Sequence, residues 1–182
     1  KHGADKLGWD WRLLAAVVYQ ESKFNPTDES WAGARGLMQL MPETAKRFGA
    51  ADLKDPKESL KAGVNYLMYL EKYWTKRIPD QQERLKFVLA SYNAGLSHIL
   101  GARKLWKKYE KDEAKWSDVE YFLLKKSDPK FYQDPLVTAG YCKCEEPVNY
   151  VEEVLHRFEE YKIHITLPQF DEQVVQSPKT AK

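Results

Sequence analysis

A single glutamate, Glu21, is the side chain of this sequence best placed to do acid–base chemistry. It continues the apolar face of Val17 and Val18 at a spacing of four and three residues, so it shares their side of a helix. A carboxyl group among apolar neighbours has its charged form disfavoured, which raises its pKa toward neutrality. Such a carboxyl can act as a general acid and then as a base. The competing interpretation is an ion pair with Lys23 or Arg35, because a glutamate at a helix C-terminus is not a stabilising cap.

The elements that must position this glutamate are predicted to be helices packed around one core. Apolar residues recur with helical spacing in seven segments, residues 9–21, 41–49, 55–74, 80–95, 96–109, 117–126 and 146–162. Asp55 is expected to cap one helix, and Ser117 with Glu120 to form a capping box at another. Only the short stretch 162–167 alternates as a strand would. The sequence therefore predicts an all-α class, with a core domain over 1–165 and a partly flexible tail over 166–182.

Composition excludes several other classes of protein. The formal charge of +2 gives no basic face for nucleic acid, and no apolar run is long enough to span a membrane. The first residues carry no secretory h-region and are interpreted as the tail of an incoming helix. Cys142 and Cys144 form a C-x-C, expected as solvent-side thiols or with partners elsewhere. The four histidines are scattered, so no metal and no cofactor are expected.

Three blocks of sequence carry a resemblance to a known family. The stretch "ESKFNPTDESWAGARGLMQLMPETA" (21–45), then "ASYNAG" (90–95) and "EPVNYVEEV" (146–154), occur in this order at matching spacings. Together they resemble the signature of the soluble-lytic-transglycosylase family, the goose-lysozyme-like enzymes that cut peptidoglycan glycan strands. The segment 140–163 is most similar to the branch of membrane-bound lytic transglycosylase F. The resemblance implies a lysozyme-like helical domain with a substrate groove.

The resemblance also implies roles for individual residues. Glu21 matches the catalytic glutamate, which would protonate the bond between N-acetylmuramic acid and N-acetylglucosamine. Glu146 and Tyr150 lie one helical turn apart and face the same way, whereas the adjacent Glu145 lacks this spacing. The residues expected to contact substrate are Ser30, Gln39, Met41, Tyr92, Asn93, Glu146 and Tyr150. Structural interpretations stay open for some of them, with Met41 as core filler, Asn93 as a helix-terminal residue and Glu146 as a helix N-terminal charge.

The implied reaction uses no water. After donating its proton, Glu21 would take a proton from the C6 hydroxyl of the same muramoyl sugar. That hydroxyl attacks C1 and leaves a 1,6-anhydromuramoyl end. One departure is Asp28, where the family has a small residue; it is expected to face solvent, although in the cleft it could permit hydrolysis. The alternatives are therefore a goose-type lysozyme, or an inactive glycan-binding or docking module. The resemblance further implies a monomer in the periplasm, associated with the outer membrane, with an upstream regulatory domain.

Overall fold

A computed structural model of the chain describes residues 1–110 and 114–166, so most of the tail predicted over 166–182 lies outside the described residues. Within the described ranges the regular elements are helices, and β-structure is confined to the isolated bridges Glu29–Arg35 and Arg35–Leu40. The helices are α1 (His2–Leu7), α2 (Trp11–Ser22), α3 (Pro42–Phe48), α4 (Pro56–Thr75), α5 (Gln81–Ala94), α6 (Leu96–Tyr109), α7 (Trp116–Lys125), α8 (Pro129–Tyr132) and α9 (Glu145–His164).

Most helix ends fall where the sequence indicates them. The Asp55 carboxylate accepts a hydrogen bond from the Lys57 amide at 2.7 Å, and the Asp80 carboxylate accepts one from the Glu83 amide at 2.8 Å. These aspartates satisfy amide groups in the first turns of α4 and α5, which have no partner within the helix. α5 then ends before Gly95, whose φ of 89° suits glycine.

Two local expectations were wrong, at the start of α7 and at the end of α9. The first residues, interpreted as part of a helix, are helical in α1, and the four residues of α8 form a further short helix that periodicity could not reveal. The helix α7 begins at Trp116 because the carboxylate of Asp118 accepts from the Lys115 amide at 2.8 Å, so Ser117 and Glu120 are not its capping box. The strand-like stretch after Lys162 continues α9 as far as His164.

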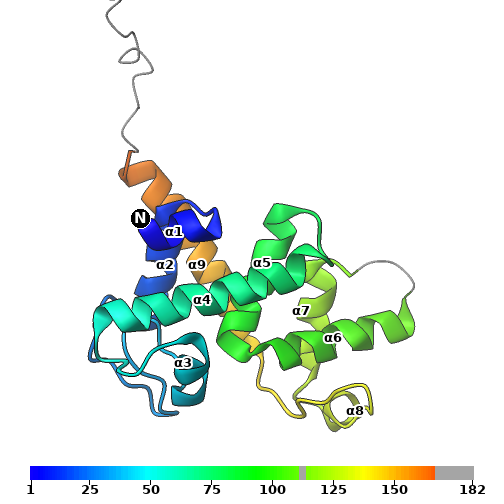
Figure 1. Cartoon of the computed structure of the whole chain (residues 1–182). Coiled ribbons are helices and arrows are strands. Elements are labelled where there is room, and N and C mark those ends of the chain that lie inside the picture. The colour runs from blue at the N-terminus through cyan, green and yellow to red at the C-terminus, as the bar shows by residue number, and fades with distance from the viewer. Residues whose placement is uncertain (111–113, 167–182) are drawn as a thin grey trace, which may run out of the picture.

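Packing joins helices that are distant in sequence. α2 packs along α9, α4 packs on α1, α3 and α5, and α6 packs on α5 and α7, so that α5 lies between the two ends of the domain (Figure 1). The core contains a chain of aromatic rings in which the Phe87 ring lies 4.9 Å from Trp74 and 5.7 Å from Trp116, centroid to centroid. The indole of Trp74 also donates to the Ser91 hydroxyl at 3.0 Å, which satisfies its buried N–H.

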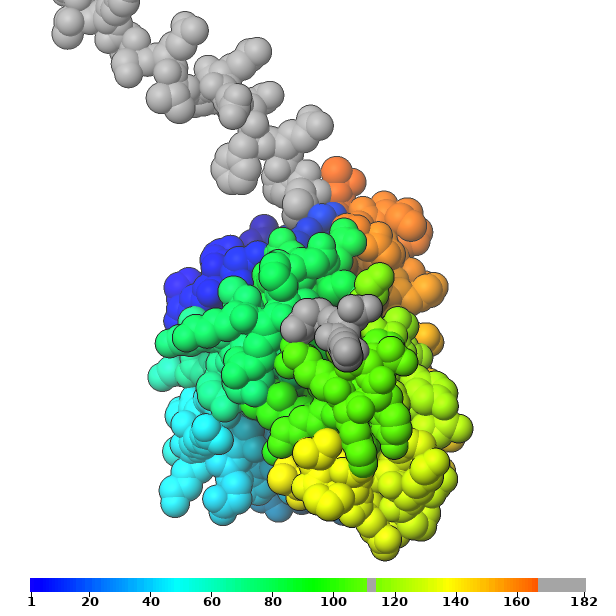
Figure 2. Space-filling view, turned by 90° about the vertical axis from the view of Figure 1, so that its right-hand side faces the viewer, coloured from blue at the N-terminus to red at the C-terminus, as the bar shows by residue number. Residues whose placement is uncertain are grey.

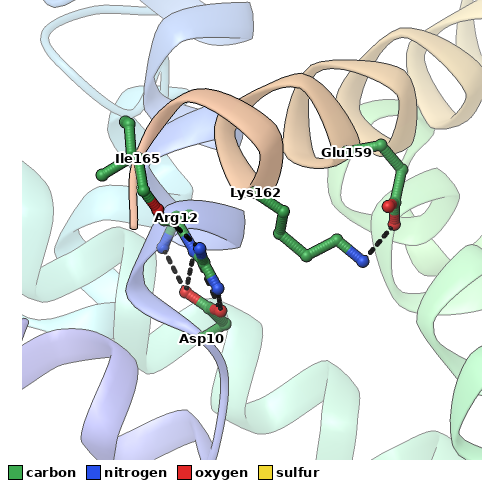
Figure 3. Close-up of polar contacts among 5 residues, drawn as sticks. All are labelled: Asp10, Arg12, Glu159, Lys162 and Ile165. Atoms are coloured by element: carbon green, nitrogen blue, oxygen red, sulfur yellow. Dashed lines mark hydrogen bonds and ion pairs between the residues drawn. The ribbon is translucent and has the colours of Figure 1, made fainter. Parts of the chain in front are cut away.

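The pairing of α2 with α9 is reinforced at the end remote from the glutamate. Arg12 donates to the Ile165 carbonyl at 2.7 Å while its guanidinium pairs with Asp10, the residue that caps α2 (Figure 3). The space-filling view shows the first helices and the end of α9 at the same end of the molecule (Figure 2). Because this contact joins the start of α2 to the end of α9, it helps to fix one helix against the other.

No helix among the described residues has the length and apolar character needed to cross a membrane.

Candidate active site

The glutamate singled out by the sequence lies on the last turn of α2. Val17 and Val18 on the same helix face are buried in the core, with exposed fractions of 0% and 6%. The helix ends at Ser22, and Lys23 follows it in the left-handed conformation with φ of 52°. The Ser22 hydroxyl hydrogen-bonds the Leu37 carbonyl at 3.0 Å, which ties the end of the helix to the loop that follows it. Glu21 is thereby held where α2, this loop and α9 meet.

Glu21 accepts a hydrogen bond from the phenol of Tyr150 on α9, with 2.5 Å between Oη and Oε1. The two residues are separated by 129 positions, and the packing of α2 on α9 brings them together. The ion-pair interpretation is not supported, because Arg35 pairs with Glu29 at 2.9 Å and the described residues show no ion pair between Glu21 and Lys23.

The surroundings of Glu21 keep it protonated near neutral pH. Burial raises the pKa of Glu21 to about 8, the hydrogen bond from Tyr150 opposes this rise, and the charge of Glu146 adds to it. The shift is larger than the move toward neutrality expected from the sequence. A carboxyl with a pKa near 8 carries its proton at pH 7 and can donate it to a bound group. Its own side chain stays partly exposed, so that a substrate can reach it.

A groove with a volume of about 930 Å³ opens over the glutamate. One wall is the loop after α2 with the start of α3, the opposite wall is the start of α9, and Tyr66, Tyr92 and the end of α5 lie between them. All eight residues predicted for the site line this one groove, namely Glu21, Ser30, Gln39, Met41, Tyr92, Asn93, Glu146 and Tyr150. A second hollow of about 630 Å³ beside α3 contains none of them.

The loop wall uses two of the predicted residues to hold its own shape. The Gln39 side-chain amide donates to the carbonyls of Asp28 and Gly36, at 3.1 and 3.0 Å. The Ser30 hydroxyl accepts a hydrogen bond from the Ala34 amide at 2.9 Å. The side-chain carbonyl of Gln39 and the hydroxyl proton of Ser30 are therefore the groups that these residues can offer to a ligand.

The base of the groove is built from two tyrosines. Tyr92 is buried and its phenol donates to the Met38 carbonyl at 2.7 Å, so its oxygen can only accept from a ligand. Burial, then the charges of Glu21 and Tyr66, raise the pKa of Tyr92 well above its usual value. The Tyr66 ring lies 5.2 Å from the Tyr92 ring, and its phenol donates to the Ser91 carbonyl at 3.2 Å.

Asp28, expected to face solvent, is partly exposed and is not among the residues that line the groove. The carboxylates that line the groove beside Glu21 are all on α9, at Glu145, Glu146 and Glu153. The first two are exposed, and Glu153 receives a hydrogen bond from Gln20. The groove is thus acidic along α9 and contains one buried carboxyl.

Sequence reasoning missed several lining residues. Trp31 and Lys143 line opposite walls, and Glu145, set aside for its spacing, lines the groove together with its neighbour Glu146. Trp31 lies inside the first block but belongs to no part of it with a recognised role, so only its size and its place in a turn could have indicated it. Lys143 lies between the two cysteines, in a segment without periodicity, so no pattern in the sequence predicts where its side chain lies.

The cysteine expectation was also wrong. Cys142 and Cys144 form a disulfide with a Cα–Cα distance of 5.1 Å, and Cys144 is 1% exposed, because the backbone before α9 turns both side chains together. The ring nitrogen of His98 and the two sulfurs lie within 4.8 Å of one another, and Lys126 contacts His98 at 2.7 Å. One of the four histidines, His98, therefore lies beside the two sulfurs, which are engaged in the disulfide.

Comparisons with known proteins agree with this architecture. A family model described as "Transglycosylase SLT domain" matches residues 1–118. A membrane-bound lytic murein transglycosylase F from Yersinia enterocolitica serotype O:8 / biotype 1B is 44% identical over 145 residues, which cover 80% of this chain and 29% of the relative. A protein of the same name from Pectobacterium atrosepticum is 40% identical over 145 residues, covering 80% and 30%. This chain spans less than a third of the length of these relatives.

Two solved structures share the fold. The lytic transglycosylase Slt from Pseudomonas aeruginosa, in an inactive mutant form, matches with a TM-score of 0.63 and 24% identity over 92% of this chain and 24% of that one. The 70 kDa soluble lytic transglycosylase from Escherichia coli matches with a TM-score of 0.59 and 23% identity over 86% of this chain and 22% of that one. These likenesses confirm the predicted all-α, lysozyme-like fold.

Proposed function

Because this chain belongs to the transglycosylase SLT domain family, we propose that it is the catalytic domain of a peptidoglycan lytic transglycosylase. The observation that carries the proposal is the protonated carboxyl of Glu21, with its pKa of about 8, in an open groove of about 930 Å³. The relatives named lytic murein transglycosylase support the choice of substrate.

The proposed reaction has two proton transfers through one side chain. Glu21 donates its proton to the oxygen that links C1 of N-acetylmuramic acid to N-acetylglucosamine, and the bond between C1 and that oxygen breaks. The muramoyl N-acetyl group stabilises the positive charge at C1. The Glu21 carboxylate then takes the proton of the C6 hydroxyl, whose oxygen forms the new bond to C1. The product is a 1,6-anhydromuramoyl end, and Glu21 recovers its proton.

Tyr150 supports both steps through the same hydrogen bond. After the first transfer the charged Glu21 carboxylate accepts a hydrogen bond from the Tyr150 phenol, with 2.5 Å between the two oxygens. A hydrogen bond to a charged acceptor is stronger than one to a neutral acceptor, so Tyr150 stabilises the ionised form more than the protonated one. The groups on the loop wall, the carbonyl of Gln39 and the hydroxyl of Ser30, are placed to accept from and donate to acetamido or hydroxyl groups of the strand.

Hydrolysis is the rival reaction, and the position of carboxylates bears on it. Glycoside hydrolysis by the usual routes needs a second carboxylate flanking the bond. Asp28 does not line the groove, so the residue that could have supplied this carboxylate is absent from the site. Glu146 lines the groove and is exposed, which makes it the group to test as an activator of water.

The test is digestion of purified sacculi followed by mass spectrometry of the released muropeptides. We expect products lighter by one water than those of a hydrolase. Glu21→Gln should lower the rate by about a hundredfold to ten-thousandfold, the usual contribution of general acid–base catalysis. Glu146→Gln tests the rival reaction, and the products that it releases should still lack the added water. Products that contain the added water, together with loss of activity in Glu146→Gln, would establish a lysozyme instead.

A substrate in the cell wall places the proposed site of action in the periplasm. The association with the outer membrane, the monomeric state, the upstream regulatory domain and the extent of the catalytic domain over 1–165 stay predictions.

A further inference from the structure

The most exposed large apolar side chain among the described residues lies on the wall of the groove. Trp31 has an exposed fraction of 101%, whereas Trp74 and Trp116 in the core have 0% and 6%. Burying a side chain of this size contributes a large apolar area to folding, and Trp31 contributes none of it. The ring contacts recorded for the described residues do not include Trp31 either, so its indole faces are free.

The backbone presents this tryptophan on a turn with fixed ends. The Gly33 amide donates to the Ser30 carbonyl at 2.9 Å, which closes a β-turn with Trp31 at its second position. The Ser30 amide and hydroxyl each bond the backbone of Ala34 at 2.9 Å, and Gly33 has φ of 91°. A side chain held by such a turn loses little backbone freedom when it binds a ligand, because the turn is already formed.

Beyond the turn, the loop is pinned at two further points. Arg35 forms backbone bridges to Glu29 and to Leu40, with hydrogen bonds of 3.1 and 3.3 Å to the latter. The guanidinium of Arg35 also pairs with the Glu29 carboxylate at 2.9 Å. The exposure of Trp31 is therefore a property of an ordered loop that carries an aromatic ring out of the core.

The two walls of the groove differ in chemistry. The loop wall presents the apolar Trp31, Ala32, Ala34 and half-exposed Met41 beside the polar Ser30 and Gln39, while the wall of α9 presents glutamates and Asn149. A pyranose ring has the same division, because its C–H groups form an apolar face and its hydroxyls and acetamido groups form a polar rim. A sugar in this groove would place its apolar face on Trp31, with its polar rim toward α9 and toward Ser30 and Gln39.

We propose that Trp31 is a substrate-binding residue whose indole stacks on a sugar ring of the β-1,4-linked, N-acetylated glycan strand. The inference rests on the proposed function, since it takes the glycan as the occupant of the groove. Stacking acts on the bound strand in the ground state and in the transition state alike, because Trp31 lies on the wall and Glu21 at the base. Its loss should therefore raise KM and leave kcat nearly unchanged.

Fluorescence can report on Trp31 separately from catalysis. In the Glu21→Gln protein, Trp31 is the indole open to iodide, since Trp9, Trp74 and Trp116 are buried and Trp11 and Trp106 are partly covered. Addition of the hexamer of β-1,4-linked N-acetylglucosamine should shift the emission to shorter wavelength and protect it from iodide. Glu21→Gln with Trp31→Phe should lose both effects.

Affinity and turnover complete the test. Trp31→Ala should raise the Kd for the hexamer and the KM for glycan strands by about tenfold, a typical value for an aromatic stacking contact, and Trp31→Phe should recover part of the loss. Tyr121→Ala, which removes an aromatic ring that is 54% exposed and does not line the groove, should leave both constants unchanged. Thermal unfolding should not move in Trp31→Ala, since the side chain makes no core contact.

Three outcomes would overturn the inference. The first is an equal Kd for the Glu21→Gln protein with and without Trp31→Ala. The second is hexamer binding that leaves the Trp31 emission and its quenching unchanged. The third is an emission shift with lipid vesicles and none with glycan, which would assign the ring to a membrane surface. In the first two cases the anhydromuramoyl product would still be formed by the unaltered chain, so the proposed function would stand.

Discussion

Removal of the Tyr150 hydroxyl should move the pH dependence of activity in a direction that the site geometry fixes. Tyr150 donates to Glu21 at 2.5 Å, and this hydrogen bond opposes the rise that burial causes in the pKa of Glu21. In Tyr150→Phe the carboxylate loses its donor while the protonated form loses little. The pKa of Glu21, about 8 in the unaltered chain, must therefore rise.

The size of the shift follows from the strength of the bond. A hydrogen bond to a charged acceptor contributes roughly 1.5–3 kcal/mol, which corresponds to about one to two pKa units at 1.36 kcal/mol for each unit. Because the free enzyme is active with Glu21 protonated, kcat/KM should fall at alkaline pH with an apparent pKa near 8. In Tyr150→Phe this alkaline limb of the pH profile should move to higher pH. The rate below the limb should fall by about threefold to tenfold, since the forming carboxylate is less stabilised.

The assay is release of anhydromuramoyl products from soluble glycan strands, measured across the alkaline range at substrate concentrations below KM. Tyr66→Phe is the matched control, because Tyr66 also lines the groove and its phenol is bonded to the Ser91 carbonyl, not to Glu21. Its limb should stay in place. A limb that does not move in Tyr150→Phe, or that moves to lower pH, would refute the assignment of Tyr150 as the donor that holds the Glu21 carboxylate.

Three further predictions concern stability. Glu21→Gln should raise the free energy of unfolding at pH 7 by at most about 3 kcal/mol, because folded Glu21 keeps its proton up to about pH 8 whereas the unfolded chain releases it near 4.5. This gain should vanish as the pH falls toward 4.5. Urea unfolding at pH 5 and at pH 7 measures the difference. Lys126→Met should raise the free energy of unfolding by about 2 kcal/mol at pH 7, because burial disfavours the charged lysine and lowers its pKa to about 8. The gain should shrink between pH 8 and 10.5 in the same assay, since folded Lys126 is then neutral and its burial costs less. Gly36→Ala should lower the free energy of unfolding by about 3 kcal/mol or more, because a Cβ there would lie 2.0 Å from the Leu53 carbonyl oxygen. Gly49→Ala, at a residue with positive φ and open space around it, should lower it by only about 1 kcal/mol. Thermal unfolding compares the two variants.

The helices could be predicted because their signals are local. In α4 the apolar spacing, Asp55 as cap and Pro56 in the first turn all indicate the same start, and the structure places the helix at Pro56–Thr75. The errors arose where two local signals competed. Ser117 was expected to cap α7, but Lys115 is the N-cap, and the Asp118 carboxylate accepts the hydrogen bond from its amide. The four residues of α8 are too few for a periodicity to show.

The sequence brought together residues that lie in one groove, but it could not predict their contacts. The three resembling blocks named eight residues, and all of them line one groove. The hydrogen bond between Tyr150 and Glu21 depends on the packing of α2 against α9, and no local pattern encodes a contact across 129 positions. The roles of Tyr92 and Gln39 also depend on neighbours, because backbone carbonyls of the loop wall accept hydrogen bonds from the Tyr92 phenol and from the Gln39 side-chain amide.

Trp31 and Lys143 show a different limit of sequence reasoning. Each is an isolated large side chain in a segment without periodicity, so the ordinary interpretation of either is a solvated loop residue. Only the positions of the two loops on opposite walls of the groove separate them from other exposed residues.

One packing arrangement accounts for both properties that Glu21 needs. The pairing of α2 with α9 buries the carboxyl, which raises its pKa, and it also delivers the Tyr150 phenol that stabilises the ionised form. The Glu21 side chain is partly exposed in the free chain, so we expect a bound strand to displace water from it. The displacement disfavours the charged form further, so the pKa that governs the chemical step lies above the one that governs substrate capture. The fold therefore supplies a proton donor that becomes harder to ionise when the sugar binds. The hydrogen bond from Tyr150 on α9 limits the rise in the pKa of Glu21.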